Sequence, residues 1–231
     1  MDNAVLITGS TRGIGFETTK RFLKAGWRVG IFCRHQRHAM EAQKQLAGLA
    51  PPENIFLLEG DVRIERDVKG IVGRCLRRFG RIEVLINNAG IIAYKPVEKT
   101  SGKEWDDIIN TNLKGTFLFL KHVVPVMRKQ GAGTIINISS AMGEAGEADF
   151  SAYCASKFGV IGLTQSVAEE TAADGIKVYA VLPWAVNTTL GAGLGLEIPP
   201  SEMLAPEYVA EKIFQAAKGV KKTGYLFRVS K

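Results

Sequence analysis

The chain of 231 residues is 46% hydrophobic and 23% charged, and it carries a formal net charge of +7. This length predicts one domain over residues 1–231, and the composition excludes a disordered chain. The three widely spaced cysteines imply neither a disulfide framework nor a zinc site, and no metal is expected. No apolar run reaches the ~18 residues of a membrane span and no leader-like segment precedes Val5, so we expect a cytoplasmic protein with no membrane partner.

A recurring pattern orders the chain: amphipathic stretches end at a glycine, and an apolar run rich in β-branched residues follows. Glycine suits the left-handed position that closes a helix, and short runs of Val, Ile and Leu suit strands buried on both faces. In chain order, the predicted strands are residues 4–8, 27–33, 55–59, 81–87, 134–139, 176–182 and 224–229. The predicted helices are residues 13–25, 37–49, 64–79, 102–129, 151–174 and 205–218. This alternation predicts a single doubly wound α/β domain with a parallel seven-stranded sheet and helices on both faces.

The first predicted strand is followed by a glycine-rich segment. In this fold class, ligands bind beyond the carboxyl ends of the strands. Glycines there allow the backbone to approach a pyrophosphate, and the amides at the start of the next helix attract the anion. A purely structural strand-to-helix turn is the alternative. We predict that the pyrophosphate of a dinucleotide is bound by Gly9, Ser10, Thr11, Arg12, Gly13, Ile14 and Gly15.

The end of the second strand discriminates between the two nicotinamide dinucleotides. A carboxylate there would bind the ribose 2′-hydroxyl of NAD, whereas a cation would bind the 2′-phosphate of NADP. The chain has Arg34 at this point and no acid before Glu41. We therefore predict that Arg34 and Arg12 hold NADP(H), with two surface charges as the alternative. This prediction gives a specific use to the basic segment 1–38, which contains seven Lys and Arg, and disfavours a nucleic-acid partner.

The third and fourth strands also end in residues suited to a nucleotide. Asp61 and Val62 follow the third strand and are predicted to contact the adenine. Asn88, Ala89 and Gly90 follow the fourth strand, where small residues and an amide leave space for a ring and offer hydrogen bonds. Ordinary turn residues are the alternative for this second group.

Tyr153 and Lys157 are the candidate acid/base pair. Positions i and i+4 share one face of a helix, so the phenol and the ammonium are predicted to point into one site, where the cation lowers the pKa of the phenol. The same pattern recurs at Tyr208 and Lys212, so spacing alone is not specific. Only Tyr153 has a hydroxyl partner that arrives from a strand end, because Ser140 lies 13 residues before it.

Together these motifs resemble the short-chain dehydrogenase/reductase family over essentially the whole chain. Residues 8–15 are similar to its TGxxxGIG motif, residues 87–90 to its NNAG motif, and Ser140, Tyr153 and Lys157 to its Ser and YxxxK. The resemblance implies a Rossmann-type sheet of order 3-2-1-4-5-6-7 and hydride transfer at nicotinamide C4. It implies Tyr153 as proton donor, Ser140 on the substrate oxygen, Lys157 on the ribose and Asn112 holding a water relay.

The segment after the sixth strand both follows the family and departs from it. Pro183, Val186 and Thr188 match family contacts to the carboxamide and phosphate of the coenzyme. Trp184 replaces the usual glycine and brings an indole to the substrate. The loop 188–206 is the predicted substrate lid.

The substrate is predicted to be a small neutral ketone or aldehyde, because residues 178–211 contain four glutamates and no Lys or Arg. The alternative is a 3-oxoacyl-[acyl-carrier-protein] reductase, which the acidic Glu169, Glu170 and Asp174 disfavour by repelling an acidic carrier. A second alternative is an NADPH-binding sensor without turnover, although such a sensor would need no complete catalytic set.

Apolar faces on segments 102–129 and 151–174 exceed what one face of a sheet can cover. Related proteins pair these helices, so a homo-oligomer is expected, either a dimer or a tetramer.

Overall fold

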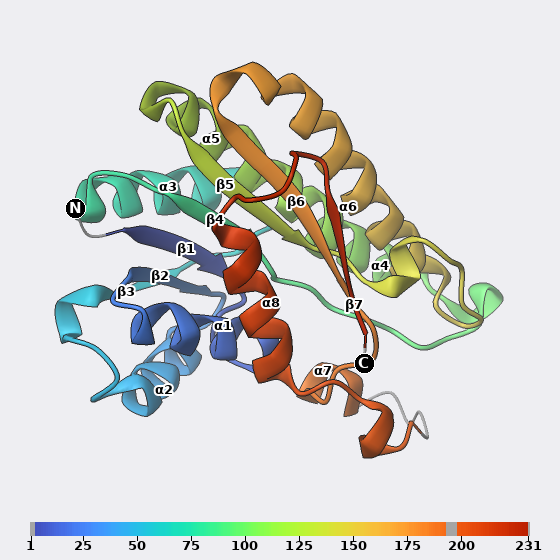
Figure 1. Cartoon of the computed structure of the whole chain (residues 1–231). Helices are drawn as coiled ribbons and strands as arrows, with labels where there is room; N and C mark the ends of the chain where they lie inside the picture. Colours follow the sequence, from blue (N-terminus) through green and yellow to red (C-terminus); the bar gives the residue numbers. More distant parts are fainter. Residues whose placement is uncertain (1–2, 193–197, 231) are drawn as a thin grey trace.

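Seven parallel strands form the centre of the structure in the order β3-β2-β1-β4-β5-β6-β7 (Figure 1). The structure is a computed structural model that describes residues 3–192 and 198–230. Its order confirms the predicted doubly wound sheet, with the strand order reversing between β1 and β4. The strands are β1 (Ala4–Thr8), β2 (Arg28–Cys33), β3 (Ile55–Glu59), β4 (Val84–Asn87), β5 (Gly133–Ile138), β6 (Ile176–Pro183) and β7 (Leu226–Val229).

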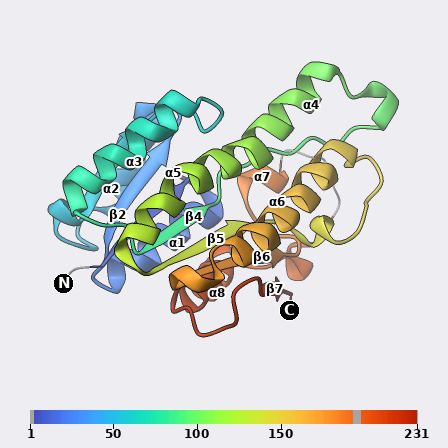
Figure 2. The ribbon, with the colours of Figure 1, turned by 90° about the horizontal axis from the view of Figure 1, so that it is seen from above.

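Helices cover both faces of this sheet, as the two views together show (Figures 1 and 2). None of the helices among the described residues is both long enough and apolar enough to cross a membrane. The main helices are α1 (Gly13–Lys24), α2 (Gln36–Leu46), α3 (Glu65–Phe79), α4 (Gly102–Ile108), α5 (Gly115–Gln130), α6 (Ser151–Glu170) and α8 (Pro206–Ala217).

The strand β1 explains why the sheet needs two layers of helices. All five of its side chains are buried, and successive residues of a strand point to opposite faces. Leu6 belongs to the apolar core shared with α3, α5 and α6, whereas Val5 and Ile7 belong to the core shared with α1, α2 and α8. Each face of the sheet therefore removes its own apolar layer from water, which holds the carboxyl ends of β1 and β4 in place.

The predicted helix 102–129 is confirmed as one helical stretch, but its hydrogen-bonding pattern changes partway along it. It comprises α4, a π-helical segment over Ile109–Lys114 and α5. A π-helical segment adds a residue to the local turn and changes the direction in which side chains project, and such segments often occur at functional sites. Asn112 lies in this segment, so the π-helical turn coincides with a predicted site residue.

The predicted lid contains two short helical segments in its described part. These are α7 (Thr189–Ala192) and a 3-10 turn over Pro200–Glu202, whereas residues 193–197 lie outside the described residues. The two ends of the segment are tied together, since Asn187 N donates to Leu204 O at 3.0 Å and Leu204 N donates to Ala185 O at 2.8 Å. These bonds place the segment against the carboxyl edge of the sheet.

Candidate active site

The glycine loop after β1 packs against the end of β4. Gly9 has φ +63°, and a Cβ at this residue would lie 2.9 Å from Ala89 Cα. The amide of Asn88 donates to the carbonyls of Thr8 and Gly9, both at 3.0 Å. A Cβ on Gly15 would collide with the Gly9 carbonyl oxygen and lie 2.5 Å from Asn88 Nδ2. The glycines thus allow α1 and two loops to meet closely at the point where strand order reverses.

A cleft opens beside this junction and encloses about 250 Å³. We call it the glycine-loop cleft. It brings together residues from the ends of β1, β2, β3 and β4, as the parallel topology requires. Among the predicted site residues, its lining includes Gly9, Thr11, Arg12, Gly13, Ile14, Arg34, Asp61, Val62, Asn88, Ala89, Gly90 and Thr188.

Two residues of the predicted pyrophosphate turn lie outside the lining of the glycine-loop cleft. Ser10 is fully buried, with its hydroxyl donating to Phe32 O at 3.3 Å and accepting from Phe32 N at 2.9 Å. Its side chain therefore ties the loop to β2. Gly15 lets α1 pack closely against Gly9 and Asn88 and does not line the cleft.

The cleft has the chemistry that a phosphorylated dinucleotide requires. Its lining includes a turn in which Gly9 and Gly13 take positive φ angles of 63° and 54° and carry no side chains of their own. Arg12 and Arg34 are exposed and come from two different elements, the β1–α1 loop and the end of β2. Exposed guanidinium groups beside a glycine turn suit phosphate oxygens.

Asp61 takes part in a charged network at the edge of the cleft. Arg63 donates to Asp61 Oδ2 at 2.7 Å and to Asp107 Oδ1 at 2.9 Å. Burial opposes ionisation of the Asp61 carboxyl, but the hydrogen bonds and charge of Arg63 outweigh it, and the pKa of Asp61 falls below its usual value. Asp61 is therefore an ionised acceptor of fixed orientation beside Val62.

A second cavity of about 230 Å³ adjoins the cleft, and Ile14, Asn88, Gly90, Thr188 and Leu190 line both. We call it the tyrosine cavity. Three of the four predicted catalytic residues, Ser140, Tyr153 and Lys157, line it. Pro183, Trp184 and Val186 also line it, which brings the segment after β6 to the same place.

Tyr153 and Lys157 are both buried on α6, one turn apart. Burial raises the pKa of Tyr153 to about 12, and a hydrogen bond with Ser140 acts in the opposite direction. Burial lowers the pKa of Lys157 to about 8. The ammonium donates to Ile138 O at 2.8 Å and lies 5.5 Å from the centre of the phenol ring. Contrary to the expectation that the cation lowers the pKa of the phenol, burial raises it and outweighs the hydrogen bond with Ser140.

Asn112 is buried and lies in the π-helical segment. Its side-chain oxygen accepts from Ile91 N at 2.8 Å, and its Nδ2 donates to Ile91 O at 2.9 Å and to Ser156 Oγ at 3.0 Å. A Cβ on Gly90 would lie 3.3 Å from Asn112 Oδ1 and 3.7 Å from Lys157 Nζ. Asn112 thus fastens the π-helical segment to the loop after β4, close to the buried ammonium.

Sequence reasoning missed most of the wall of the tyrosine cavity. This wall is apolar and comes mainly from irregular loops, which carry no periodic signal. The one sequence feature that could have identified some of these residues is their position next to a motif residue. Met142, for example, lies two residues after Ser140. Trp184, which was predicted, contributes its indole although it is 56% exposed. The apolar lining includes Ile92, Met142, Phe150, Trp184, Leu190 and Met203.

The second Tyr-Lys pair lies apart from this geometry. Tyr208 is 42% exposed on α8, and Lys212 lies 4.9 Å above its ring. Neither residue is part of the described lining of the cleft or the cavity. The structure thus places only the pair on α6 beside Ser140.

Comparisons with known proteins identify the family and agree with the fold. The family model described as short chain dehydrogenase matches residues 3–197. A 3-oxoacyl-[acyl-carrier-protein] reductase FabG of Staphylococcus aureus is 35% identical over 198 residues, covering 86% of this chain and 80% of that protein. Levodione reductase of Leifsonia aquatica is 33% identical over 215 residues, 93% and 79% of the two chains. The structure of ElxO with NADP bound has a TM-score of 0.90 at 31% identity, covering 99% and 97%.

Proposed function

This chain belongs to the short chain dehydrogenase family, and from that premise we propose that it transfers a hydride between NADP(H) and a small neutral ketone or aldehyde, or the matching alcohol. One observation carries the proposal. Ser140, Tyr153 and Lys157 meet where an apolar cavity joins a cleft that carries exposed arginines. This arrangement supports a role for Tyr153 as a proton donor between a coenzyme in the cleft and an uncharged substrate in the cavity.

The residues of the glycine-loop cleft would hold the coenzyme. Arg12 and Arg34 would bind the 2′-phosphate, and the glycine turn would face the pyrophosphate. The structure of ElxO with NADP bound supports this choice, as does the absence of an acid directly after β2 in the sequence. When bound, NADPH supplies the hydride that reduces the carbonyl carbon.

Tyr153 would supply the proton. A phenol with a pKa of about 12 is fully protonated at neutral pH, which is the state that a general acid needs for ketone reduction. Ser140 would hydrogen-bond the substrate oxygen, since its hydroxyl belongs to the same cavity wall and interacts with the phenol. An alkoxide is a stronger base than a phenolate, so it would take the proton once it formed.

Lys157 would stabilise the phenolate that proton transfer leaves behind. Its ammonium is held by Ile138 O and lies near the Tyr153 ring, in a buried setting where charges interact strongly. The family resemblance also assigns Lys157 to the ribose of the coenzyme. Asn112, beside it, would then hold the water relay that the same resemblance implies.

The substrate would be neutral and apolar near its carbonyl. Lys157 is the only residue with a charged side chain in the described lining of the tyrosine cavity, and Trp184, Phe150 and Met142 present ring or thioether surfaces. An anionic substrate would have to shed its hydration there without finding a second cation.

A 3-oxoacyl-[acyl-carrier-protein] reductase is the second candidate, because FabG is among the relatives. On this chain, however, the cation beside the end of α6 is already paired: Arg128 donates to Asp174 at 2.7 Å and to the Glu170 carbonyl at 3.0 Å. A panel of carbonyl compounds that includes an acyl-carrier thioester separates the two candidates.

The experiment that tests the proposal compares Tyr153→Phe with Tyr208→Phe on any accepted carbonyl. Loss of the Tyr153 hydroxyl should lower kcat by at least about 10²-fold while NADPH binding persists. Tyr208→Phe is the matched control and should leave kcat nearly unchanged. A Tyr153→Phe enzyme with more than about a tenth of the activity would contradict the assignment, and NADPH binding without any carbonyl turnover would favour a sensor.

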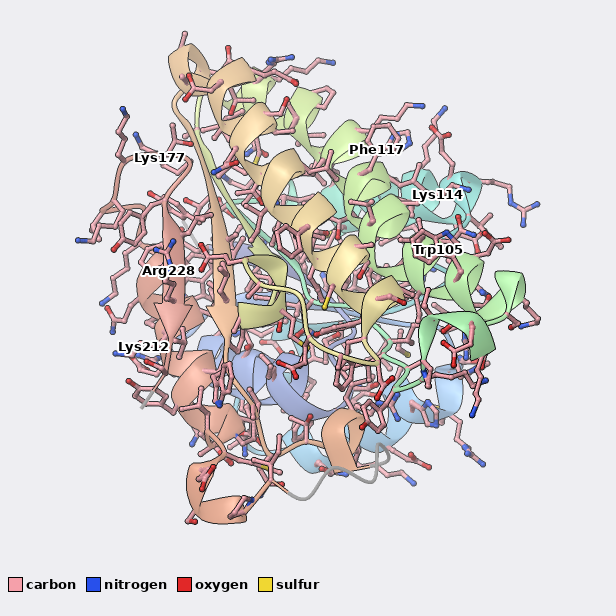
Figure 3. The ribbon with its side chains drawn as sticks, turned by 90° about the vertical axis from the view of Figure 1, so that its right-hand side faces the viewer. Trp105, Lys114, Phe117, Lys177, Lys212 and Arg228 are labelled. Carbon is pink, nitrogen blue, oxygen red and sulfur yellow. The ribbon has the colours of Figure 1, made fainter. Side chains whose placement is uncertain are left out.

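We also propose that the chain forms a homo-oligomer. A groove between α5 and α6 is lined by Ile109, Leu113, Phe117 and Leu163. Trp105 is 41% exposed and Phe117 is 45% exposed, and they lie along the α4–α5 edge (Figure 3). Apolar side chains gathered on one edge of a helical layer suit a self-complementary contact with a second copy.

A further inference from the structure

Two of the chain's three histidines, His35 and His38, line the glycine-loop cleft. His35 is the residue that precedes α2, and His38 lies in the first turn of that helix. Their rings meet edge to face with centroids 5.8 Å apart. Neither ring was among the predicted site residues, and the motifs around the glycine turn do not require them.

The contact between Arg34 and His35 depends on the protonation state of the imidazole. Arg34 Nε donates to His35 Nε2 at 3.1 Å. A guanidinium can only donate, so this bond requires a neutral ring with a lone pair on Nε2. Once His35 is protonated, both ring nitrogens become donors and the bond to Arg34 is lost. Two cations then lie side by side, and this arrangement favours an anion between them.

The charged groups around Arg34 and His35 leave a net positive charge at this end of the cleft. Asp61 is engaged by Arg63, and the carboxylate of Glu59 accepts from the Gln36 amide at 3.4 Å. Arg37 and Glu41 approach each other on α2. The other charged or titratable groups around Arg34 and the two histidines are Arg12, Cys33, Arg66, Asp67 and Arg74.

We propose that His35 and His38 are proton-accepting ligands of the 2′-phosphate of NADP(H), so that the coenzyme binds together with proton uptake. The inference rests on the proposed function. In the chain without the phosphate, neutral His35 accepts from Arg34. A phosphate at the mouth of the cleft takes over Arg34 and accepts hydrogen bonds from the protonated imidazoles. Coenzyme selectivity then depends on pH in the range where histidine titrates.

The sign of this effect distinguishes it from the chemistry of the phosphate. A cationic site favours the dianion, so the phosphate itself releases protons on binding and favours binding at higher pH. Histidine ligands have the opposite effect, because binding an anion raises the pKa of an imidazole and affinity falls as pH rises. Removing both rings therefore leaves the contribution of the phosphate alone.

The test measures binding and needs no turnover. Calorimetric titration with 2′,5′-ADP, in two buffers of different ionisation enthalpy, gives the number of protons taken up near pH 7. Titration with 5′-AMP is the control for the ligand, and His122→Gln is the control for the protein, since His122 bonds Glu65 on α3, outside the cleft lining. The test variants are His35→Gln, His38→Gln and the double variant.

The wild type and His122→Gln should take up more protons with 2′,5′-ADP than the double variant does. Nicotinamide fluorescence gives the dissociation constants of NADH and NADPH, and the NADH constant divided by the NADPH constant measures the preference for NADPH. Between about pH 6 and pH 8 this ratio should fall in the wild type, and its fall should exceed that in the double variant by about three- to tenfold. Equal proton uptake and equal pH profiles in both proteins would overturn the inference. Equal binding of NADPH and NADH at every pH would instead overturn the proposed coenzyme.

Discussion

The buried ammonium of Lys157 should destabilise the folded chain, and replacing it by Met should reveal the cost. Burial lowers the pKa of Lys157 from 10.5 to about 8. Each pKa unit corresponds to about 1.4 kcal/mol, so keeping the charge in the folded state at pH 7 costs about 3 kcal/mol. Lys157→Met also removes the hydrogen bond to Ile138 O, worth about 1 kcal/mol. The variant should therefore be more stable at pH 7 by about 2 kcal/mol, although it loses a proposed catalytic group.

The pH dependence has a definite sign. Below about pH 8 both the folded and the unfolded chain carry the proton on Lys157, and the full cost is present. Between about pH 8 and 10.5 the unfolded chain keeps the proton while the folded chain releases it, so wild-type stability rises with pH. The advantage of Lys157→Met should shrink across this window and reverse by about 1 kcal/mol at its upper end.

Urea unfolding at fixed protein concentration, without added coenzyme, measures this difference at several pH values between about 7 and 10. Lys212→Met is the matched control, because Lys212 is the exposed lysine of the second Tyr-Lys pair. It should change stability by less than about 0.5 kcal/mol at every pH. A stability difference between Lys157→Met and wild type that does not vary with pH would refute the reasoning.

Three further outcomes are expected. Arg34→Asp should reduce or invert a preference for NADPH over NADH that is at least about tenfold in the wild type, and equal dissociation constants in the wild type would contradict the assignment. Gly15→Ala should lower the free energy of unfolding by about 3 kcal/mol, because the added Cβ meets the Gly9 carbonyl oxygen. Urea denaturation measures this loss, and a value below about 1 kcal/mol would be inconsistent with that contact. Phe117→Asp should shift the chain toward the monomer in sedimentation at micromolar concentration; a monomeric wild type would exclude the proposed oligomer.

The order of strands and helices could be predicted from the sequence because the signals are local. The run Val5-Leu6-Ile7 requires burial on both sides, and the glycine turn behind it has a conformation that other residues rarely adopt. The strand order came from the family resemblance, and the structure confirms it. The candidate site could also be located in advance, because parallel strands bring their carboxyl ends to one edge.

The tertiary structure decided how those residues are used. A helical pattern over 102–129 does not reveal that Asn112 lies in a π-helical segment. Nor does it reveal that the Asn112 side chain hydrogen-bonds the backbone of Ile91, 21 residues away in the loop after β4. The sequence predicts a cation beside Tyr153. It does not predict how deeply the phenol is buried, and this burial raises the pKa of the phenol. The hydrogen bonds between the Ser10 hydroxyl and the backbone of Phe32 likewise join segments 22 residues apart. Desolvation and long-range hydrogen bonds are properties of packed surroundings, and local sequence patterns do not contain them.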